Sequence, residues 1–575
     1  MNDEVLKRAK SWLKETFDPK TRAEVQRMID SDPNALSDAF FKELSFGTGG
    51  LRGLMGVGTS RLNVYTIRAV TLGLANTLLQ QPKQPEGYSV FIGYDVRNHS
   101  KEFAEVAARV LAAKNIHVKI TKEICPTPLV SFGCRHYRCM AAIMITASHN
   151  PPAYNGYKVY WQDGGQVVPP HDLEIINEVR KIDVAEPIAM SPIETPLIQW
   201  IGHELDEAYL KELKRLQLYP AEALKILYTP LHGTGIRIIP EALKSWGYTD
   251  LSFVEEQKNP DGNFPNCPSP NPEEKKALEL GTKKLVEQKR DILIANDPDA
   301  DRIGIVVLDR GKAFALTGNQ MACIALYHIC VALHSSKKFP PNGAFIKTIV
   351  TTELFRKIGE HFGGACFDVL TGFKYIAEQI RLWENSFDAY QFLFGAEESY
   401  GCLFETFVRD KDAISASCLM AEAASLAKKQ NITLVDRLYQ LYEKFGIHRE
   451  SLATLAFEES STGMEKMSAL MKRLRTSHPT QIGNIEVERV EDYLTGVSKN
   501  LITHQSTKLT LPESDVLRFW LKDGSKLVIR PSGTEPKVKI YAEVVHEDAR
   551  DIDRDIAAAD ARLKTLVDSF RQEVN

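Results

Sequence analysis

The sequence lacks paired cysteines, a long apolar run and an excess of charge of either sign. Its nine cysteines are scattered without a C-x-x-C pair, which favours reduced, buried thiols over a disulfide framework or a zinc site. The longest apolar stretch, around residues 321–333, is interrupted by His328 and is too short to span a bilayer. A formal net charge of −4 is not typical of a nucleic-acid or anionic-membrane binder. Since the N-terminus also does not resemble a signal peptide, we expect a cytoplasmic protein with neither kind of partner.

Size and hydrophobic patterning predict several α/β domains. The 575 residues, 43% of them hydrophobic, are enough for several packed cores. Strand-like runs alternate with helical runs, which predicts mixed, mainly parallel sheets. The predicted domains are an N-terminal helical prefix at 1–40, α/β domains at 41–195, 196–315 and 316–432, and a C-terminal α+β domain at 433–575. Three Gly-rich loops, "FGTGGLRG", "LHGTGIR" and "LTGFKYI", echo one another and are compatible with three related α/β units.

The stretch "ITASHNPPAYNGYKVYW" joins two predicted strands through a stiff polar loop. Its Asn-Gly pair at 155–156 predicts a hairpin turn, and its two prolines restrict the backbone. This loop would hold Ser148 at the end of a buried strand, with Lys158 returning nearby. The G-x-S-x-G pattern of many hydrolases is absent, and on an extended chain His149 should point away from its neighbour Ser148. A tight turn whose polar side chains satisfy their own backbone is the structural alternative.

The stretch "ANDPDADRIGIVV" carries Asp297, Asp299 and Asp301 at the end of a predicted strand. Three carboxylates at this spacing can converge on one hard cation, which suits Mg²⁺. An EF-hand is excluded because its sixth position would be Arg302 and its twelfth Leu308. A solvated acidic turn is the alternative, but three carboxylates flanked by buried strands would repel one another without a counter-ion.

Four further regions contain glycine together with charged or hydroxyl side chains. Arg52 and Lys374 each follow a Gly-rich loop and could contact a doubly anionic ligand, while Glu397 and Ser399 end an aromatic strand and could bond sugar hydroxyls. Each region alone could be an ordinary turn. The last region is a strand–loop–strand suited to phosphate, with backbone N–H groups, hydroxyls and a guanidinium in Arg530, Ser532, Gly533 and Thr534.

Together, "TASHNPPAYNGYK", "DPDADR", "GAEES" and "RPSGTEP", in this order, closely resemble the motifs of the α-D-phosphohexomutase superfamily. The resemblance covers nearly the whole chain and implies four domains, three of them related α/β units, around a central cleft. The length, the "EES" form and the helical prefix resemble the long phosphoglucomutase branch, which also includes phosphopentomutases and a sugar-bisphosphate synthase. A histidine found in a mannose-handling branch is replaced here by Gly401.

The resemblance implies roles for individual residues. Ser148 would be the phosphorylated serine, and its phosphate would touch a Mg²⁺ held by the three aspartates. Lys158 would be a general acid/base, Arg52 would contact the transferring group, and Arg302 would lie near the phosphoserine, with His149 in support. The residues that would bind sugar and the non-reacting phosphate are Thr371, Gly372, Lys374, Glu397, Ser399, Arg530, Ser532, Gly533 and Thr534.

The implied reaction interconverts α-D-glucose 1-phosphate and glucose 6-phosphate through glucose 1,6-bisphosphate, which would also act as an activator. The expected partner is therefore a small phosphosugar. Phosphopentomutase, hexose-bisphosphate synthase and phosphomannomutase activities stay open as alternatives, as does a catalytically silent phosphosugar-binding protein. The silent alternative predicts erosion at Ser148 or at the aspartates, whereas every one of these positions holds a chemically competent residue.

Overall fold

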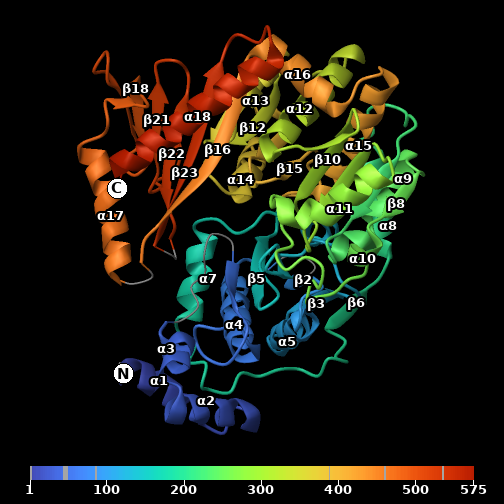
Figure 1. Cartoon of the computed structure of the whole chain (residues 1–575). Coiled ribbons are helices and arrows are strands. Elements are labelled where there is room, and N and C mark those ends of the chain that lie inside the picture. Colours follow the sequence, from blue (N-terminus) through green and yellow to red (C-terminus); the bar gives the residue numbers. More distant parts are fainter. Residues whose placement is uncertain are drawn as a thin grey trace. The chain divides into compact units, whose positions relative to one another are not determined.

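The computed structural model describes residues 3–42, 50–83, 87–387, 389–458, 461–533 and 536–574 (Figure 1). The chain divides into two compact units. The first contains Met1–Gly318, Ile376–Gly395 and Ser399–Asn431, and the second contains Asn319–Tyr375, Ala396–Glu398 and Ile432–Asn575. The described residues form four sheets, and the predicted α/β class with a C-terminal α+β domain is confirmed. None of the described helices is both long and apolar enough to cross a membrane.

The N-terminal segment is helical, as predicted. Its helices are α1 (Asp3–Ser11), α2 (Pro19–Ser31) and α3 (Pro33–Phe40). They enclose an aromatic cluster in which Trp12 stacks on Phe17 at 4.6 Å between ring centroids. Tyr65, at the start of the following helix, donates a hydrogen bond of 2.7 Å to Asp18, the N-cap of α2. The segment is therefore packed onto the rest of the first unit through both apolar and polar contacts.

The first sheet has the strand order β1-β5-β4-β2-β3-β6. β2, β3, β4 and β6 are parallel, whereas β5 is antiparallel to β4 and to β1. Its strands are β1 (Gly50–Leu54), β2 (Ser89–Tyr94), β3 (His117–Thr121), β4 (Ala141–Ile145), β5 (Tyr154–Trp161) and β6 (Ile198–Ile201). β2 and β4 are buried along their whole length, as the near-continuous apolar runs of central parallel strands require.

Helices cover both faces of this sheet. They are α4 (Val64–Gln80), α5 (Ser100–Ala113), α6 (Thr127–His136) and α7 (His171–Val179). Along β2, Val90 and Ile92 join the core cluster that includes residues of α4 and α5, whereas the ring of Phe91 lies against Gly133 of α6. Successive side chains of a strand point to opposite faces, so α6 packs on the face opposite to α4 and α5.

The prediction of a hairpin turn at the Asn-Gly pair is wrong. β4 and β5 do run antiparallel, but the connection is 146–153, and Asn155 and Gly156 lie inside β5. Asn155 is buried and donates to Asn98 O at 3.0 Å and to Ser100 Oγ at 2.9 Å. A Cβ on Gly156 would lie 2.4 Å from Thr146 O. The pair therefore serves close backbone packing in a strand that has neighbours on both sides.

The second sheet has the order β11-β10-β9-β7-β8, with β7, β8 and β9 parallel and β10 and β11 added antiparallel. Its strands are β7 (Ile226–Thr229), β8 (Leu251–Phe253), β9 (Ile292–Asn296), β10 (Ile303–Asp309) and β11 (Lys312–Ala315). The helices nearby in the first unit are α8 (Glu204–Lys214), the 3₁₀ helix η1 (Thr234–Arg237), α9 (Ile239–Trp246), α10 (Glu255–Lys258), α11 (Lys275–Glu287) and α15 (Ala413–Lys429).

The second unit begins with α12 (Gly318–Ser335), β12 (Gly343–Thr348), α13 (Glu353–His361) and β13 (Ala365–Val369). β12 and β13 pair in parallel. α14 (Phe373–Glu384) and β14 (Gln391–Glu397) contribute residues to both units, and β15 (Gly401–Leu403) belongs to the first.

The C-terminal part of the second unit is an antiparallel sheet with helices. Its strands are β16 (Ile447–Ala456), β17 (Gln481–Ile482), β18 (Ile485–Asp492), β19 (Val497–Asn500), β20 (Ser506–Lys508), β21 (Leu517–Leu521), β22 (Lys526–Pro531) and β23 (Lys537–His546). Its helices are α16 (Leu434–Phe445), α17 (Ser461–Thr476) and α18 (Ile552–Val574), of which α18 packs on β16 and β23 (Figure 1). In the sequence, "KDGSK" at 522–526 contains an Asp-Gly pair, which predicts a hairpin turn. The hairpin is confirmed, since β21 and β22 pair up to Trp520 and Lys526.

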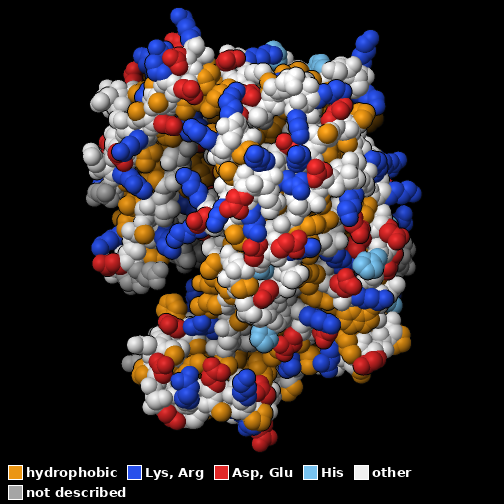
Figure 2. All heavy atoms as spheres, turned by 45° about the vertical axis from the view of Figure 1, so that its right-hand side comes forward, with side chains coloured by type: hydrophobic (Ala, Val, Ile, Leu, Met, Phe, Trp, Pro, Cys, Tyr) orange, Lys and Arg blue, Asp and Glu red, His pale blue; other side chains and the backbone are white. Residues whose placement is uncertain are grey.

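Acidic and basic side chains are interspersed on the surface (Figure 2), and several buried charged side chains form ion pairs. Figure 2 shows acidic and basic side chains interspersed across one face, in keeping with the small net charge. Within the second unit, buried Lys526 lies 2.7 Å from Glu353 and 3.1 Å from Glu543. His448 lies 2.7 Å from Glu543, and Glu450 faces Glu543 across β16 and β23. A buried ionic network therefore joins α13 to the C-terminal sheet.

Candidate functional site

Ser148 follows β4 and points its hydroxyl at a buried carboxylate. Its backbone is left-handed, with φ 51°, and its N–H donates to Thr146 Oγ1 at 2.8 Å. The Oγ donates to Asp297 Oδ2 at 2.7 Å, and the residue is only 1% exposed. A non-glycine residue in this region of φ and ψ is uncommon and is held here by a specific hydrogen bond. The loop thus aims Ser148 at the aspartate cluster.

The expectation that His149 would point away from Ser148 is wrong. His149 Nδ1 lies 3.2 Å from Ser148 Oγ, because the left-handed turn at Ser148 replaces the extended chain on which the expectation depended. Burial holds the pKa of His149 well below its usual range, and the nearby cations Arg302 and Arg52 lower it further. The imidazole is therefore neutral at pH 7 and can share a hydrogen bond with the serine hydroxyl.

Arg97, which the motif analysis missed, holds the Ser148 loop from behind. Its guanidinium donates to Ser148 O at 2.6 Å, to Pro151 O at 2.9 Å and to Tyr154 O at 3.0 Å. It also pairs with Asp95 at 3.3 Å, and both side chains are fully buried. A guanidinium fork suits several acceptors at once. The available signal was the "DVR" that follows the buried strand β2, since charged residues directly after such a strand often belong to a site.

The three aspartates follow β9 and converge, as their spacing predicts. Asp297, Asp299 and Asp301 are at most 2% exposed, and one carboxylate oxygen from each lies within 4.8 Å of the others. Asp297 Oδ1 accepts hydrogen bonds from the backbone N–H groups of Asp301 and Arg302 at 3.1 and 2.9 Å. The loop therefore turns tightly on its own first side chain.

The cluster has the properties of a cation site. Oδ1 of Asp299 and Oδ1 of Asp301 are buried and accept no hydrogen bond from the described part of the chain. Burial, together with repulsion from Asp299 and Asp301, raises the pKa of Asp297 well above its usual range. Hard anionic oxygens that lack donors are the ligands that a hard divalent cation requires. The triad could hold a metal ion.

Two buried lysines flank the triad. Lys158 Nζ lies 2.9 Å from Asp299 Oδ2 and 3.3 Å from Asp301 Oδ2. Burial lowers the pKa of Lys158, but Asp299 and Asp301 outweigh it and the pKa ends above its usual value. Lys411, which the motif analysis missed, lies 3.2 Å from Asp301 Oδ2 and directly precedes Asp412, the N-cap of α15. In sequence it belongs to the charged run "RDKD", which is typical of a solvated turn.

The two predicted arginines of the first unit lie around the same cluster. Arg52, on β1, donates to Asn150 Oδ1 of the Ser148 loop at 3.3 Å. Arg302 Nε lies 3.9 Å from Asp301 Oδ1, and its Nη1 lies 3.6 Å from Glu273. The first unit thus brings the predicted serine, histidine, lysine, aspartates and both arginines into one region.

The remaining predicted residues are described within their own units. In the second unit, Gly372 N donates to Glu397 Oε1 at 3.0 Å, which joins the two predicted sugar-contacting segments. Lys374 is 5% exposed, and its ammonium lies 5.1 Å from the Tyr375 ring centroid. Thr371 precedes α14, Arg530 lies in β22, and Ser532 N donates to Lys537 O at 2.7 Å. Gly533 follows Ser532, Ser399 belongs to the first unit, and Thr534 lies outside the described residues.

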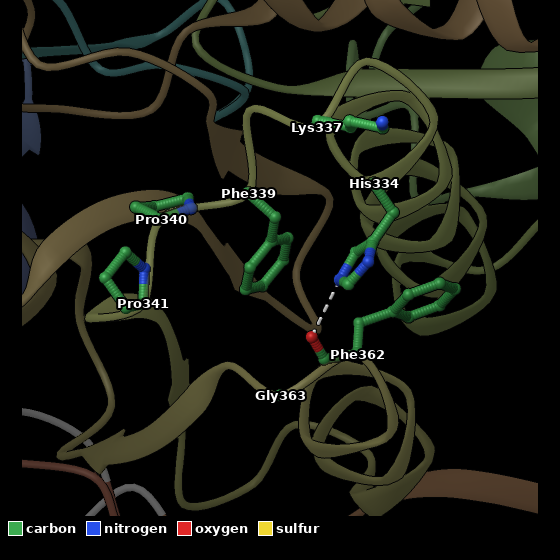
Figure 3. A pocket seen from close by; sticks show the side chains of 7 residues that line it. All are labelled: His334, Lys337, Phe339, Pro340, Pro341, Phe362 and Gly363. Atoms are coloured by element: carbon green, nitrogen blue, oxygen red, sulfur yellow. Dashed lines mark hydrogen bonds between the residues drawn. The ribbon is translucent and has the colours of Figure 1, made fainter.

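A separate hollow of about 340 Å³ lies in the second unit at the end of α12 (Figure 3). His334, Phe339 and Phe362 contribute rings to it, and His334 Nε2 lies 2.9 Å from Phe362 O. Pro340 and Pro341 form another part of its wall. It contains none of the predicted site residues, so we treat it as distinct from the candidate site.

Comparisons with known proteins agree with the motifs. Sequence models of the phosphoglucomutase/phosphomannomutase family match in order: α/β/α domain I at 43–186, domain II at 207–311, domain III at 317–445 and the C-terminal domain at 481–559. A protein named phosphoglucomutase from Staphylococcus haemolyticus (strain JCSC1435) is 35% identical over 554 residues, which cover 95% of this chain and 98% of that protein. A phosphoglucomutase from Staphylococcus aureus (strain bovine RF122 / ET3-1) is 36% identical over 515 residues, covering 88% of this chain and 90% of that protein.

Solved structures share the fold. A phosphoglucomutase/phosphomannomutase family protein from Burkholderia thailandensis superposes with a TM-score of 0.66 at 18% identity, covering 92% of this chain and 96% of that one. The open form of pp63/parafusin, a phosphoglucomutase from Paramecium, superposes with a TM-score of 0.64 at 18% identity, covering 92% and 95%.

Proposed function

Because the chain belongs to the phosphoglucomutase/phosphomannomutase family, we propose that it interconverts α-D-glucose 1-phosphate and glucose 6-phosphate. The proposed route runs through a phosphoserine at Ser148 and a glucose 1,6-bisphosphate intermediate, with Mg²⁺ as the metal. The relatives named phosphoglucomutase, similar over nearly their whole length, support this activity. The observation that carries the proposal is the 2.7 Å hydrogen bond from Ser148 Oγ to Asp297 Oδ2. Asp297 is one of three aspartates that together could hold a metal ion.

The proposed chemistry consists of two phosphoryl transfers. In the first, the bond between phosphorus and Ser148 Oγ breaks and a bond between phosphorus and a hydroxyl oxygen of the sugar monophosphate forms. The sugar hydroxyl loses a proton and Ser148 Oγ gains one, so that a serine hydroxyl and a sugar bisphosphate result. The bisphosphate then turns around, and its other phosphate returns to Ser148, so that the phosphoenzyme is restored. Such transfers depend on in-line positioning and charge neutralisation. Mg²⁺ bound by Asp297, Asp299 and Asp301 would supply neutralisation of the transferring group.

The chain's own residues have distinct proposed roles. Arg52 and Arg302 would contact the phosphoryl group as fixed cations. Lys158 is the proposed general acid/base, which its carboxylate partners keep protonated before substrate arrives. His149, neutral and 3.2 Å from Ser148 Oγ, would orient that oxygen.

In the second unit, Glu397 and the segment from Thr371 to Lys374 are the proposed sugar-binding residues; Ser399, in the first unit, is a proposed sugar-binding residue as well. Arg530, Ser532, Gly533 and Thr534 would bind the non-reacting phosphate.

One observation supports glucose over mannose. The sequence has Gly401 where a mannose-handling branch has histidine, and a Cβ at Gly401 would lie 2.2 Å from Lys411 Cδ. A larger side chain at 401 therefore requires Lys411 to move away from Asp301. We propose that the Lys411 arrangement and a histidine at position 401 are alternatives.

The test measures the phosphoenzyme and turnover separately. Intact-mass analysis of the purified protein should show one phosphate, which Ser148→Ala should lose. Glucose, mannose and ribose 1-phosphates would be assayed with and without glucose 1,6-bisphosphate, and we expect turnover of the glucose ester to be fastest. Ser245→Ala, which removes only a local hydrogen bond to Ala242 O, is the matched control. Full activity of Ser148→Ala would reject the mechanism, and steady release of inorganic phosphate would indicate a phosphatase instead.

A further inference from the structure

The Gly-rich loop "LHGTG" at 231–235 is not used by any step of the proposed reaction. It packs against the segment 297–302 that carries the three aspartates, called the metal loop below. Thr234 contacts Pro298, the residue between Asp297 and Asp299, through two hydrogen bonds. Thr234 N donates to Pro298 O at 2.7 Å, and Thr234 Oγ1 donates to the same oxygen at 2.9 Å. A single carbonyl of the metal loop is thus held by a backbone and a side-chain donor at once.

Gly233 brings the two backbones into direct contact. A Cβ at Gly233 would lie 2.4 Å from Pro298 Cα and 2.6 Å from Pro298 O. The φ of Gly233 is −93°, which any residue can adopt, so backbone conformation does not explain the glycine. Close approach to the metal loop does, because any side chain would push against backbone atoms that have little freedom to move.

The 231–235 loop is itself firmly anchored. His232 N donates to Gln257 O at 2.8 Å, and His232 Nδ1 lies 2.9 Å from Asn259 O. Leu231 N donates to Thr229 Oγ1 at 3.1 Å. Leu231 and His232 both have positive φ, 46° and 63°, and such conformations persist where the surroundings hold them. Because the 231–235 loop is held in place, a larger side chain at Gly233 or Thr234 would displace the metal loop and not the 231–235 loop itself.

The metal loop is held on another side by Thr127, at the start of α6. Thr127 N donates to Asp299 O at 2.8 Å, and Thr127 Oγ1 donates to Asp299 Oδ2 at 2.8 Å. Asp297 O accepts from Ala300 N at 2.9 Å. The carbonyls of Asp297, Pro298 and Asp299 therefore each accept at least one hydrogen bond, whereas Oδ1 of Asp299 and Oδ1 of Asp301 accept none from the described residues.

We propose that Gly233 and Thr234 are positioning residues for the metal site: they fix Pro298 and thereby the distance between the carboxylates of Asp297 and Asp299. This inference rests on the proposed metal-binding function. It predicts that changes at 233 and 234 alter metal affinity although neither residue supplies a ligand. Loss of groups that orient metal ligands typically weakens binding about 10- to 100-fold.

The test compares isothermal titration of Mg²⁺ into EDTA-treated, full-length variants. Thr234→Val removes the hydroxyl donor but keeps size and the N–H bond, and should weaken Mg²⁺ binding about tenfold. Thr234→Ser keeps the hydroxyl and should stay within about twofold of wild type, and Gly233→Ala should weaken binding more than Thr234→Val. Thr77→Val is the matched control, since Thr77 is buried in α4 and donates to Gly73 O at 2.9 Å.

The outcomes separate the two hypotheses. If wild type binds no Mg²⁺, the proposed metal function fails. If wild type binds Mg²⁺ and Thr234→Val binds within twofold of it, the positioning inference fails alone. Weakening by Thr77→Val equal to that by Thr234→Val would also overturn it, because the effect would then follow general destabilisation. Should Gly233→Ala not fold, the comparison of the Val and Ser variants at Thr234 decides.

Discussion

Replacing Arg97 by lysine should separate loop orientation from charge. Arg97 donates to the carbonyls of Ser148, Pro151 and Tyr154 and pairs with buried Asp95. Lysine keeps the positive charge, so Asp95 is not left without a counter-ion. However, a single ammonium cannot reproduce the fork that spans acceptors at both ends of the loop.

The magnitude follows from the lost hydrogen bonds. A hydrogen bond to a charged group contributes about 1.5–3 kcal/mol, and an unsatisfied buried carbonyl costs a similar amount. Arg97 also donates to Asn150 O at 2.5 Å, so the loop carbonyls accept four bonds. If lysine restores two or three of these four bonds, one or two are lost, and Arg97→Lys should lower the free energy of unfolding by about 2–6 kcal/mol. The catalytic effect should be larger than stability alone explains, since a displacement of about 1 Å at a reacting atom can cost about 100-fold in rate.

The assay pairs chemical denaturation with kcat for glucose 1-phosphate, both at a temperature where the variants are folded. Arg237→Lys is the matched control: Arg237 is nearly as buried, donates to Ile124 O at 2.6 Å and pairs with Asp206 at 2.7 Å. It should lose comparable stability while kcat stays within about threefold of wild type. Wild-type kcat in folded Arg97→Lys, or an equal loss of kcat in Arg237→Lys, would refute the reasoning about loop orientation.

Two further predictions concern stability. Burial and the neighbouring Glu543 raise the pKa of Glu450 from 4.5 to about 8, so between these values the native state binds the proton that the unfolded state has released. The free energy of unfolding should therefore fall as pH rises from 4.5 to about 8 and level off above that. Glu450→Gln should flatten that fall in denaturant titrations at several pH values; an unchanged pH profile would contradict the assignment. At Gly58, where φ is +121°, an added Cβ would lie 2.3 Å from Ala39 O. At Gly311, where φ is +80°, an added Cβ meets no described atom within 4 Å. Gly58→Ala should therefore lower the free energy of unfolding by more than Gly311→Ala does. Equal midpoints for the two variants in thermal unfolding would contradict a clash with α3.

The elements were predictable where one local pattern decides the structure. β2, β4 and β9 are short apolar runs, and each is buried along its length. Two turn signals had opposite outcomes. "KDGSK" makes the predicted hairpin, with Gly524 at φ +82°, because Asp523 and Gly524 lie between the end of β21 and the start of β22 and not inside a paired strand. The Asn-Gly pair at 155–156 lies in a strand with partners on both sides, and pairing with β1, about a hundred residues earlier, is not visible in a local window.

The site was predictable where its residues are adjacent in sequence, and not where distant segments meet. Ser148 and the aspartate triad follow strands and carry their chemistry in short motifs. Lys411 lies in a charged stretch that is typical of a solvent-exposed turn. The "DVR" of Arg97 follows a buried strand, but it does not show which residues Arg97 contacts, and only the fold places it against Ser148, 51 positions away. His149 was misjudged for a different reason: its direction depends on one left-handed residue, and a positive φ at a serine has no reliable sequence signal.

In two carboxylates of the triad, those of Asp299 and Asp301, one oxygen has partners and the other accepts no hydrogen bond from the described residues. Asp299 Oδ2 is held by Lys158 and Thr127, and Asp301 Oδ2 lies near both Lys158 and Lys411, whereas Oδ1 of each has no donor among the described residues. A cation on the open oxygens would not need to displace either lysine. The lysines can therefore remain as counter-charges when a metal binds, which keeps three buried carboxylates tolerable in both states.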